Sequence, residues 1–217
     1  MKQKNMILTG ALLLALCLTL TACGGEKTLG VVKNQETGAI LSLGMTREEV
    51  ETALKLSSEE KEHRPDKTWP ELKEALSWQA HYGKLENLIT VCYDWDTDKV
   101  VELGVEQSPS NWVLDGAITT GATKEEIKKQ YGEPSVPEDQ AIYYRNDNTQ
   151  AYGVGLSYNY DADGAKTDGT NTDMFLSFMI DPDGELDHVG VIKYDKKYDI
   201  VGVDDNHVDF TGESKNG

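Results

Sequence analysis

Apolar and polar residues alternate with a period of two along several stretches of the chain, which predicts β-strands. The alternating stretches fall in two groups, the first at 76–82, 88–95 and 99–106 and the second at 142–146, 152–160, 174–181 and 185–194. Turn-forming sequences rich in aspartate, proline and glycine separate several of them. Each group is therefore expected to form an antiparallel meander.

A helical pattern precedes each group of strands. Thr46 and Thr123 are each followed three residues later by a glutamate, with apolar residues at helical spacing beyond. This T-x-x-E arrangement is the capping box that begins a helix. We expect a short helix after each threonine, the second ending at Gly132, because a glycine followed by a proline stops a helix. A further helical stretch is expected at 70–75.

The two helix starts belong to similar segments, 43–50 and 120–127, which lie 77 residues apart and share four identical positions. We therefore expect an α+β fold of two tandem units, each a short helix with antiparallel strands, that form one curved sheet with the helices packed on one face. The expected boundaries are a tether at 23–38, the first unit at 39–106, a linker at 107–116, the second unit at 117–195 and a C-terminal tail at 196–217.

The helix-start segments carry a resemblance to known proteins. Residues 43–50, and residues 120–134 with their ending Tyr131-Gly132-Glu133-Pro134, resemble the opening motif of the BamE-like lipoproteins. The tandem spacing is similar to that of β-lactamase inhibitor protein, which has two helix-plus-four-strand units, and the resemblance covers about 40–194. It implies a sheet with an open face that binds a protein partner. The sequence departs from the inhibitor, which has a disulfide in each unit, and the first helix lacks the Gly and Pro stop.

The N-terminus has the pattern of a secretory signal, with two lysines before an apolar run too short to span a bilayer. Its end, Leu20-Thr21-Ala22-Cys23, resembles the bacterial lipoprotein box. We therefore expect residues 1–22 to be a signal peptide and Cys23 to carry the lipid. The mature protein would be anchored to the extracytoplasmic face of the cell membrane.

The cysteine content and the net charge restrict the class of partner and the kind of cell that we expect. Once Cys17 and Cys23 are assigned to the leader and the lipid, Cys92 alone remains, so no intramolecular disulfide is expected. This usage is typical of a Gram-positive surface protein. The chain has 21 Lys+Arg against 38 Asp+Glu, a formal net charge of −17. Phosphate backbones would repel such a chain, which excludes nucleic acid and favours a protein partner with a basic face.

Alternation also sorts the strand residues into two faces. The residues expected in the core are Trp78, Ala80, Ile89, Val91, Tyr93, Val101, Leu103, Leu156, Tyr158, Leu176 and Ile180. The residues expected on the other face, as the partner-binding site, are His81, Thr90, Asp94, Glu102, Tyr143, Arg145, Asn159, Phe175 and Met179. Aromatic residues, Met and Arg among polar residues are typical of a protein-binding patch. A register shifted by one residue would instead bury Phe175 and Met179.

The sequence gives only weak indications of metal binding and none of catalysis. The four histidines have no metal-ligand spacing, and no catalytic group of residues is recognisable, so no cofactor and no enzyme activity are expected. The hairpin Asp161-Ala162-Asp163-Gly164 leaves calcium open, although Lys166 stands where an EF-hand needs Gly. We expect a non-enzymatic surface lipoprotein that binds a protein. Its role would be that of an inhibitor or that of a module in envelope assembly. The alternative is a lipoprotein that binds calcium or a small molecule.

Overall fold

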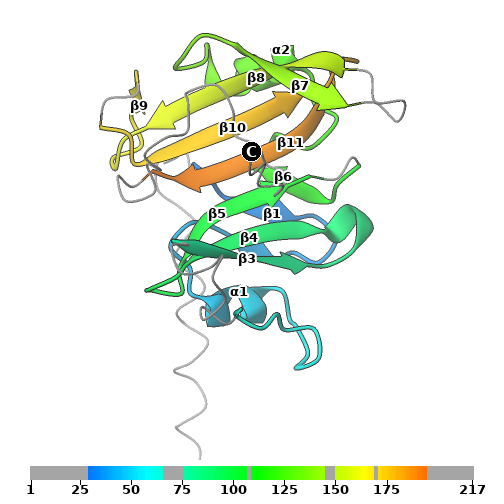
Figure 1. Cartoon of the computed structure of the whole chain (residues 1–217), viewed down its shortest axis with the longest axis vertical. Coiled ribbons are helices and arrows are strands. Elements are labelled where there is room, and N and C mark those ends of the chain that lie inside the picture. The colour runs from blue at the N-terminus through cyan, green and yellow to red at the C-terminus, as the bar shows by residue number, and fades with distance from the viewer. Residues whose placement is uncertain (1–28, 66–75, 107–108, 145–149, 169–170, 195–217) are drawn as a thin grey trace, which may run out of the picture.

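A computed structural model describes residues 29–65, 76–106, 109–144, 150–168 and 171–194. Two antiparallel sheets make up most of this part (Figure 1). The smaller sheet has the order β2-β1-β6, and the larger sheet has the order β3-β4-β5-β11-β10-β8-β7, with β9 paired to β8. The strands are β1 (Val32–Asn34), β2 (Ile40–Leu41), β3 (Ser77–Tyr82), β4 (Ile89–Asp94), β5 (Val100–Val105), β6 (Trp112–Leu114), β7 (Asp139–Tyr144), β8 (Gln150–Tyr160), β9 (Lys166–Thr167), β10 (Met174–Ile180) and β11 (Leu186–Lys193).

The expected fold class is wrong. The fold is mainly β, and the described residues hold two short α-helices, α1 (Arg47–Ala53) and α2 (Lys124–Tyr131), with a 3-10 turn, η2 (Leu85–Asn87). Each α-helix buries only two residues, which is too little to cover a sheet of this width. Neither is long and apolar enough to cross a membrane. The leader, the helix expected at 70–75 and the C-terminal tail lie outside the described residues.

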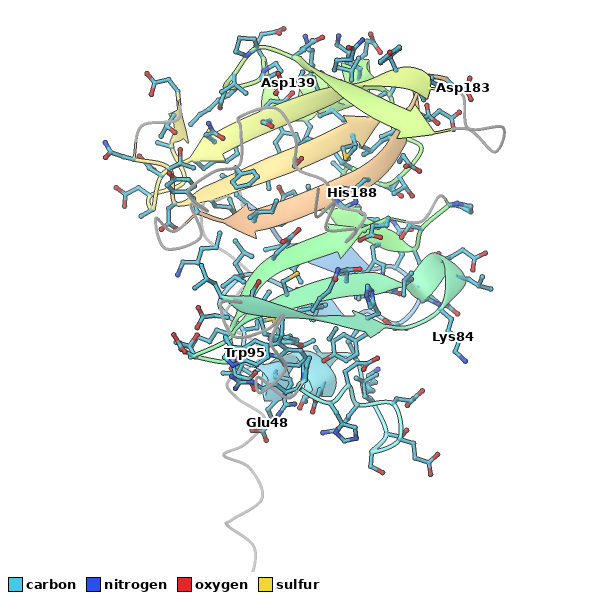
Figure 2. The ribbon with its side chains drawn as sticks, in the orientation of Figure 1. Glu48, Lys84, Trp95, Asp139, Asp183 and His188 are labelled. Atoms are coloured by element: carbon cyan, nitrogen blue, oxygen red, sulfur yellow. The ribbon has the colours of Figure 1, made fainter. Side chains whose placement is uncertain are left out.

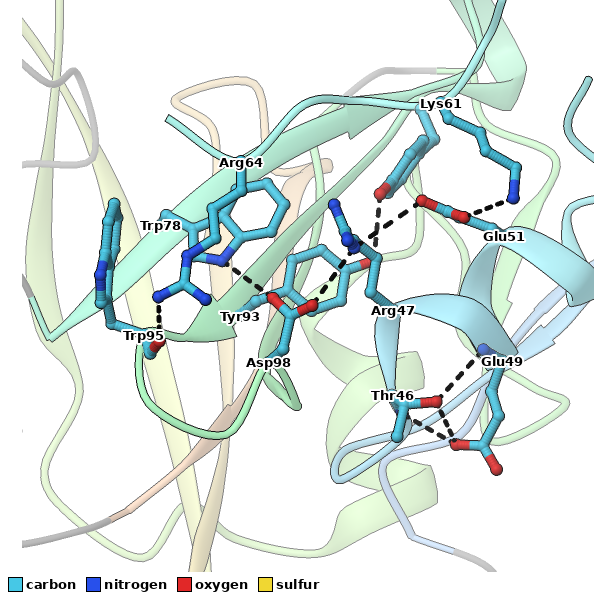
Figure 3. A network of polar contacts seen from close by, with 11 residues as sticks. Thr46, Arg47, Glu49, Glu51, Lys61, Arg64, Trp78, Tyr93, Trp95 and Asp98 are labelled. Carbon is cyan, nitrogen blue, oxygen red and sulfur yellow. Dashed lines mark hydrogen bonds and ion pairs between the residues drawn. The ribbon is translucent and has the colours of Figure 1, made fainter. Parts of the chain in front are cut away.

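The expected helix starts are confirmed. Thr46 and Thr123 are the N-caps, and each forms a complete capping box with the glutamate three residues on. In the first box the carboxylate of Glu49 accepts hydrogen bonds from the amide and hydroxyl of Thr46, at 2.8 and 3.0 Å (Figure 3). Gly132 follows α2 with a φ of +79°, a conformation that glycine adopts without strain.

The larger sheet is continuous because β5 pairs with β11, 86 residues further along the chain. Gly104 lies directly opposite Gly190, between the pairs Leu103–Val191 and Val105–Val189. On one side of this pairing β5, β4 and β3 follow in order, and on the other side β11, β10 and β8. The two groups of strands expected from the alternation are thus joined into one sheet.

The smaller sheet supplies the second layer of the core. Its buried residues Val32, Leu41, Trp112 and Leu114 belong to the same apolar cluster as the buried residues of the larger sheet. In Figure 1 this sheet lies behind β4 and β5. β1 and β6 fall in the segments expected to be tether and linker, and β2 falls at the start of the expected first unit. No alternation is visible there, because strands of two or three residues are too short for a periodic pattern.

A cluster of amides ties the two sheets together. Asn87, in the connection between β3 and β4, accepts a hydrogen bond from Asn34 of β1 at 2.8 Å and donates one to Glu36 at 2.6 Å. Its backbone carbonyl accepts a hydrogen bond from the indole of Trp112 at 3.1 Å. Asn111 donates to both Asn87 and Glu36. The side chain of this one residue, next to β4, thus bonds Asn34, Glu36 and Asn111 of the smaller sheet and its connections.

We expect Asn87→Ala to lower the free energy of unfolding by about 1–3 kcal/mol, because it leaves the buried amide of Asn34 without its partner. Urea denaturation followed by tryptophan fluorescence measures this. Lys84→Ala, in the same connection but exposed, is the control and should stay within about 0.5 kcal/mol of the natural protein. Equal stability of both variants would show that the amide cluster does not hold the sheets together.

Candidate functional site

The two faces of the larger sheet differ in burial. Of the residues expected in the core, all except Val101 are buried. Val101 is half-buried because Tyr93 pairs with Val100 and Cys92 with Glu102, so that Val101 is the extra residue of a β-bulge. Phe178 is fully buried, whereas Phe175 and Met179 are half-buried. The register expected from the alternation is therefore confirmed, and the shifted register is wrong.

The face opposite the core, here called the open face, includes a row of small residues that crosses five strands. Strand register places Thr90, Gly104, Gly190, Ser177 and Ser157 side by side, with His81 at the outer end of the row on β3. Glycines inside strands leave the backbone open to close approach. The buried apolar residues of the two helices and of the smaller sheet belong to the core on the other side of the larger sheet.

His188 lies over the glycine pair at the middle of this row (Figure 2). A methyl group added at Gly104 would lie 3.6 Å from Cε1 of its ring, and one at Gly190 would lie 3.5 Å from Nε2. The side chain is 7% exposed, and this burial lowers the pKa of His188, although nearby Glu106 acts in the opposite direction. The imidazole is therefore neutral at pH 7.

Cys92 and Glu102 form the next row, two residues along the same strands as Thr90 and Gly104. They lie opposite each other on β4 and β5. Burial raises the pKa of Cys92, and the charge of Glu102 adds to this effect. Burial also raises the pKa of Glu102, with Glu106 acting in the same direction and the hydrogen bond to Cys92 against it. Cys92 is therefore a protonated thiol at neutral pH and a poor nucleophile.

The structure brings most of the expected partner-binding residues to the open face. His81 is exposed and shares a 3.1 Å hydrogen bond with Thr90, which is itself buried. Glu102, Asn159, Phe175 and Met179 are half-buried there. In the strand register Phe175 lies between Asn159 and Ile192, and Met179 lies between Gly155 and His188.

Asp94 lies on the same side of β4 as Thr90 and Cys92, opposite Ser77 of β3, but it is buried at the end of the strand. It is 2% exposed, and its Oδ1 accepts hydrogen bonds from the amides of Asp96 and Thr97 at 3.1 and 2.8 Å. This carboxylate therefore holds the turn between β4 and β5. Tyr143 lies on β7 opposite Ala151, and Arg145 lies outside the described residues.

The glycine pair, Ser177 and His188 were not predicted as site residues. A glycine inside an alternating segment is a signal for close backbone approach, and both Gly104 and Gly190 carry it. That signal does not reveal that the two glycines face each other, because their strands are far apart in the sequence.

The aspartate-rich hairpin has a turn-forming role. Oδ1 of Asp161 accepts hydrogen bonds from the amides of Asp163 and Ala165 at 3.0 and 2.8 Å. Asp181 makes the same contacts with Asp183 and Glu185 in the turn between β10 and β11. Within the described residues, no group of three or more His, Cys, Asp or Glu side chains is placed to hold a metal ion.

Comparison with known proteins yields little. No protein-family model matches the sequence, and no curated protein matches it. A solved structure of a DUF4309 family protein, YjgB of Bacillus subtilis, aligns with a TM-score of 0.38 and 14% sequence identity, over 73% of this chain and 86% of that one. A likeness this distant supports no statement about fold or function.

We expect acid to destabilise the natural protein more than the variant His188→Gln. In the unfolded chain this histidine takes up a proton at about pH 6.5, whereas burial lowers its pKa in the folded protein. Proton binding then favours the unfolded state, so stability falls as the pH drops below about 6.5. Urea midpoints at about pH 7.5 and about pH 5 measure the difference. If the urea midpoint falls by the same amount between the two pH values in both proteins, a buried, neutral His188 is contradicted.

Proposed function

We propose that this protein is a cell-surface lipoprotein with a non-enzymatic, protein-binding role, and that it binds its partner through the open face of the larger sheet. The observation that supports this best is the composition of that face. It presents Phe175, Met179 and Ile192 together with the polar side chains Gln79, His81 and Asn159, on strands that the β5–β11 pairing holds in one sheet.

Such a mixture suits protein recognition. Aromatic residues and methionine are enriched where proteins meet, and polar neighbours keep the free surface soluble. Of the row of small residues, Ser157 and Ser177 are half-buried and within reach of a partner, whereas Thr90, Gly104 and Gly190 are buried. Because the face is built on paired strands, little conformational entropy would be lost on binding.

The charge of the face indicates what kind of partner it suits. The charged side chains that the structure places beside the glycine pair, Glu102 and Glu106, are both acids. The chain as a whole has a formal net charge of −17. A partner with a basic surface would therefore be attracted at long range and aligned on arrival.

The anchoring part of the proposal rests on the sequence. Cys23 would carry the lipid, residues 1–22 would be removed, and the domain would stay attached to the extracytoplasmic face of the membrane. An inhibitor of a cell-wall enzyme and an assembly factor of the envelope are both forms of this role.

Capture of the partner from the surface of the cells that make the protein tests the proposal. The chain from Gly24 onward, immobilised, should retain a partner, and the double variant Phe175→Ala/Met179→Ala should retain at least about tenfold less. Truncation of a central contact residue commonly costs about 2 kcal/mol of binding energy or more.

The matched control is Ile40→Ala, which removes an exposed apolar side chain from β2 of the smaller sheet. It should leave capture unchanged, and thermal melting of each variant would show that it is folded. Loss of capture in Ile40→Ala, with full capture by the double variant, would place the binding surface elsewhere and overturn the proposal.

A further inference from the structure

A groove separate from the open face lies beside α2. One wall is the segment 117–122, which follows β6, and the other wall is formed by Glu126, Lys129 and Gln130 of the helix. Its volume is about 510 Å³, within the range of sites that bind small molecules.

The first wall is held firmly. Ile118 exchanges two backbone hydrogen bonds with Leu114 of β6, at 2.7 and 3.0 Å. The amide of Gly121 donates to the carbonyl of Leu186 at 2.7 Å, and the amide of Leu186 donates to the carbonyl of Ala122 at 2.9 Å. A wall tied to β6 and β11 in this way is preorganised for a ligand.

A buried hydroxyl in this wall lacks a partner. Thr120 is 6% exposed and lines the groove, and its Oγ1 has no hydrogen-bond partner in the described structure. Buried polar groups without partners are rare in native proteins because they cost stability. The residue at the equivalent place before α1, Leu43, is apolar and packs against the core. The unpaired hydroxyl of Thr120 thus lowers the stability of the folded protein, unless a ligand forms a hydrogen bond with it.

The helix wall carries two opposite charges that are available to a ligand. Lys124 and Lys128 form ion pairs with Glu138, whereas Lys129 takes part in none among the described residues. Glu126 uses one carboxylate oxygen, Oε2, in the capping box of Thr123. An anion alone would be repelled by a chain of net charge −17, but a molecule carrying both an ammonium and a carboxylate would not.

We propose that this groove binds a short zwitterionic peptide of about dipeptide size. Its carboxylate pairs with Lys129 and its ammonium with Glu126. A polar group of the peptide bonds the hydroxyl of Thr120, and small apolar side chains lie against Ile118 and Ala122. This site is independent of the protein-binding face and of the proposed function.

Titration of the full chain with L-alanyl-L-valine tests the proposal, with calorimetry for affinity and amide chemical shifts for location. We expect saturable binding that shifts the amides of residues 117–130. Acetylation of the amino end, and amidation of the carboxyl end, should each weaken binding at least about tenfold, because each removes one charge-assisted contact.

Three variants separate a binding role from a structural one. Thr120→Val keeps the shape and removes the hydroxyl, so it should weaken binding at least about fivefold while the melting temperature stays equal or rises. Lys129→Gln should weaken binding at least about tenfold. Lys124→Gln, on the same helix but outside the groove, should leave binding unchanged. Absence of saturable binding up to about 20 mM, or equal affinity of Thr120→Val and the natural protein, would overturn the proposal.

Discussion

The pairing of β5 with β11 is the contact on which the rest of the molecule depends. It joins strands that lie 86 residues apart in the chain, and it places Gly104 against Gly190 with apolar pairs on either side. Without it, β5 and β11 would each be an open edge with unpaired backbone groups. With it, the strands before and after form one sheet, with one buried side and one open side. Both the core and the proposed binding face depend on this strand pairing.

The buried side needs a cover, and the two helices are too short to provide it. The three-stranded sheet supplies Val32, Trp112 and Leu114 to the shared core, and Asn87 fixes its position by bonding three of its segments. Among the described residues, the buried apolar residues of the helices and of both sheets gather in one core cluster, and the proposed binding face lies on the opposite side of the larger sheet. The polar contacts of Asn87 therefore help to determine which side of the larger sheet the smaller sheet covers.

Sequence patterns predicted the features that depend on neighbouring residues. Capping boxes at Thr46 and Thr123 need only four residues, and alternation within long strands sets the register of Phe175 and Met179 correctly. The smaller sheet was missed because its strands are too short to show a period. Alternation gives the face of Asp94 but not its burial, because a carboxylate at a strand end can bond the turn that follows. The Gly104–Gly190 contact and the fold class depend on long-range pairing, which alternation does not encode.

We propose that a protein partner covers the open face on the cells that make the protein. Hydroxyl-radical footprinting compares the protein on its own cells with the purified soluble chain, and reports the solvent access of single side chains. We expect oxidation of Met179 and Phe175 to be markedly slower on the cells, while Leu85, 72% exposed on η2, oxidises at the same rate in both. Equal oxidation of Met179 and Phe175 in the two samples would contradict the account.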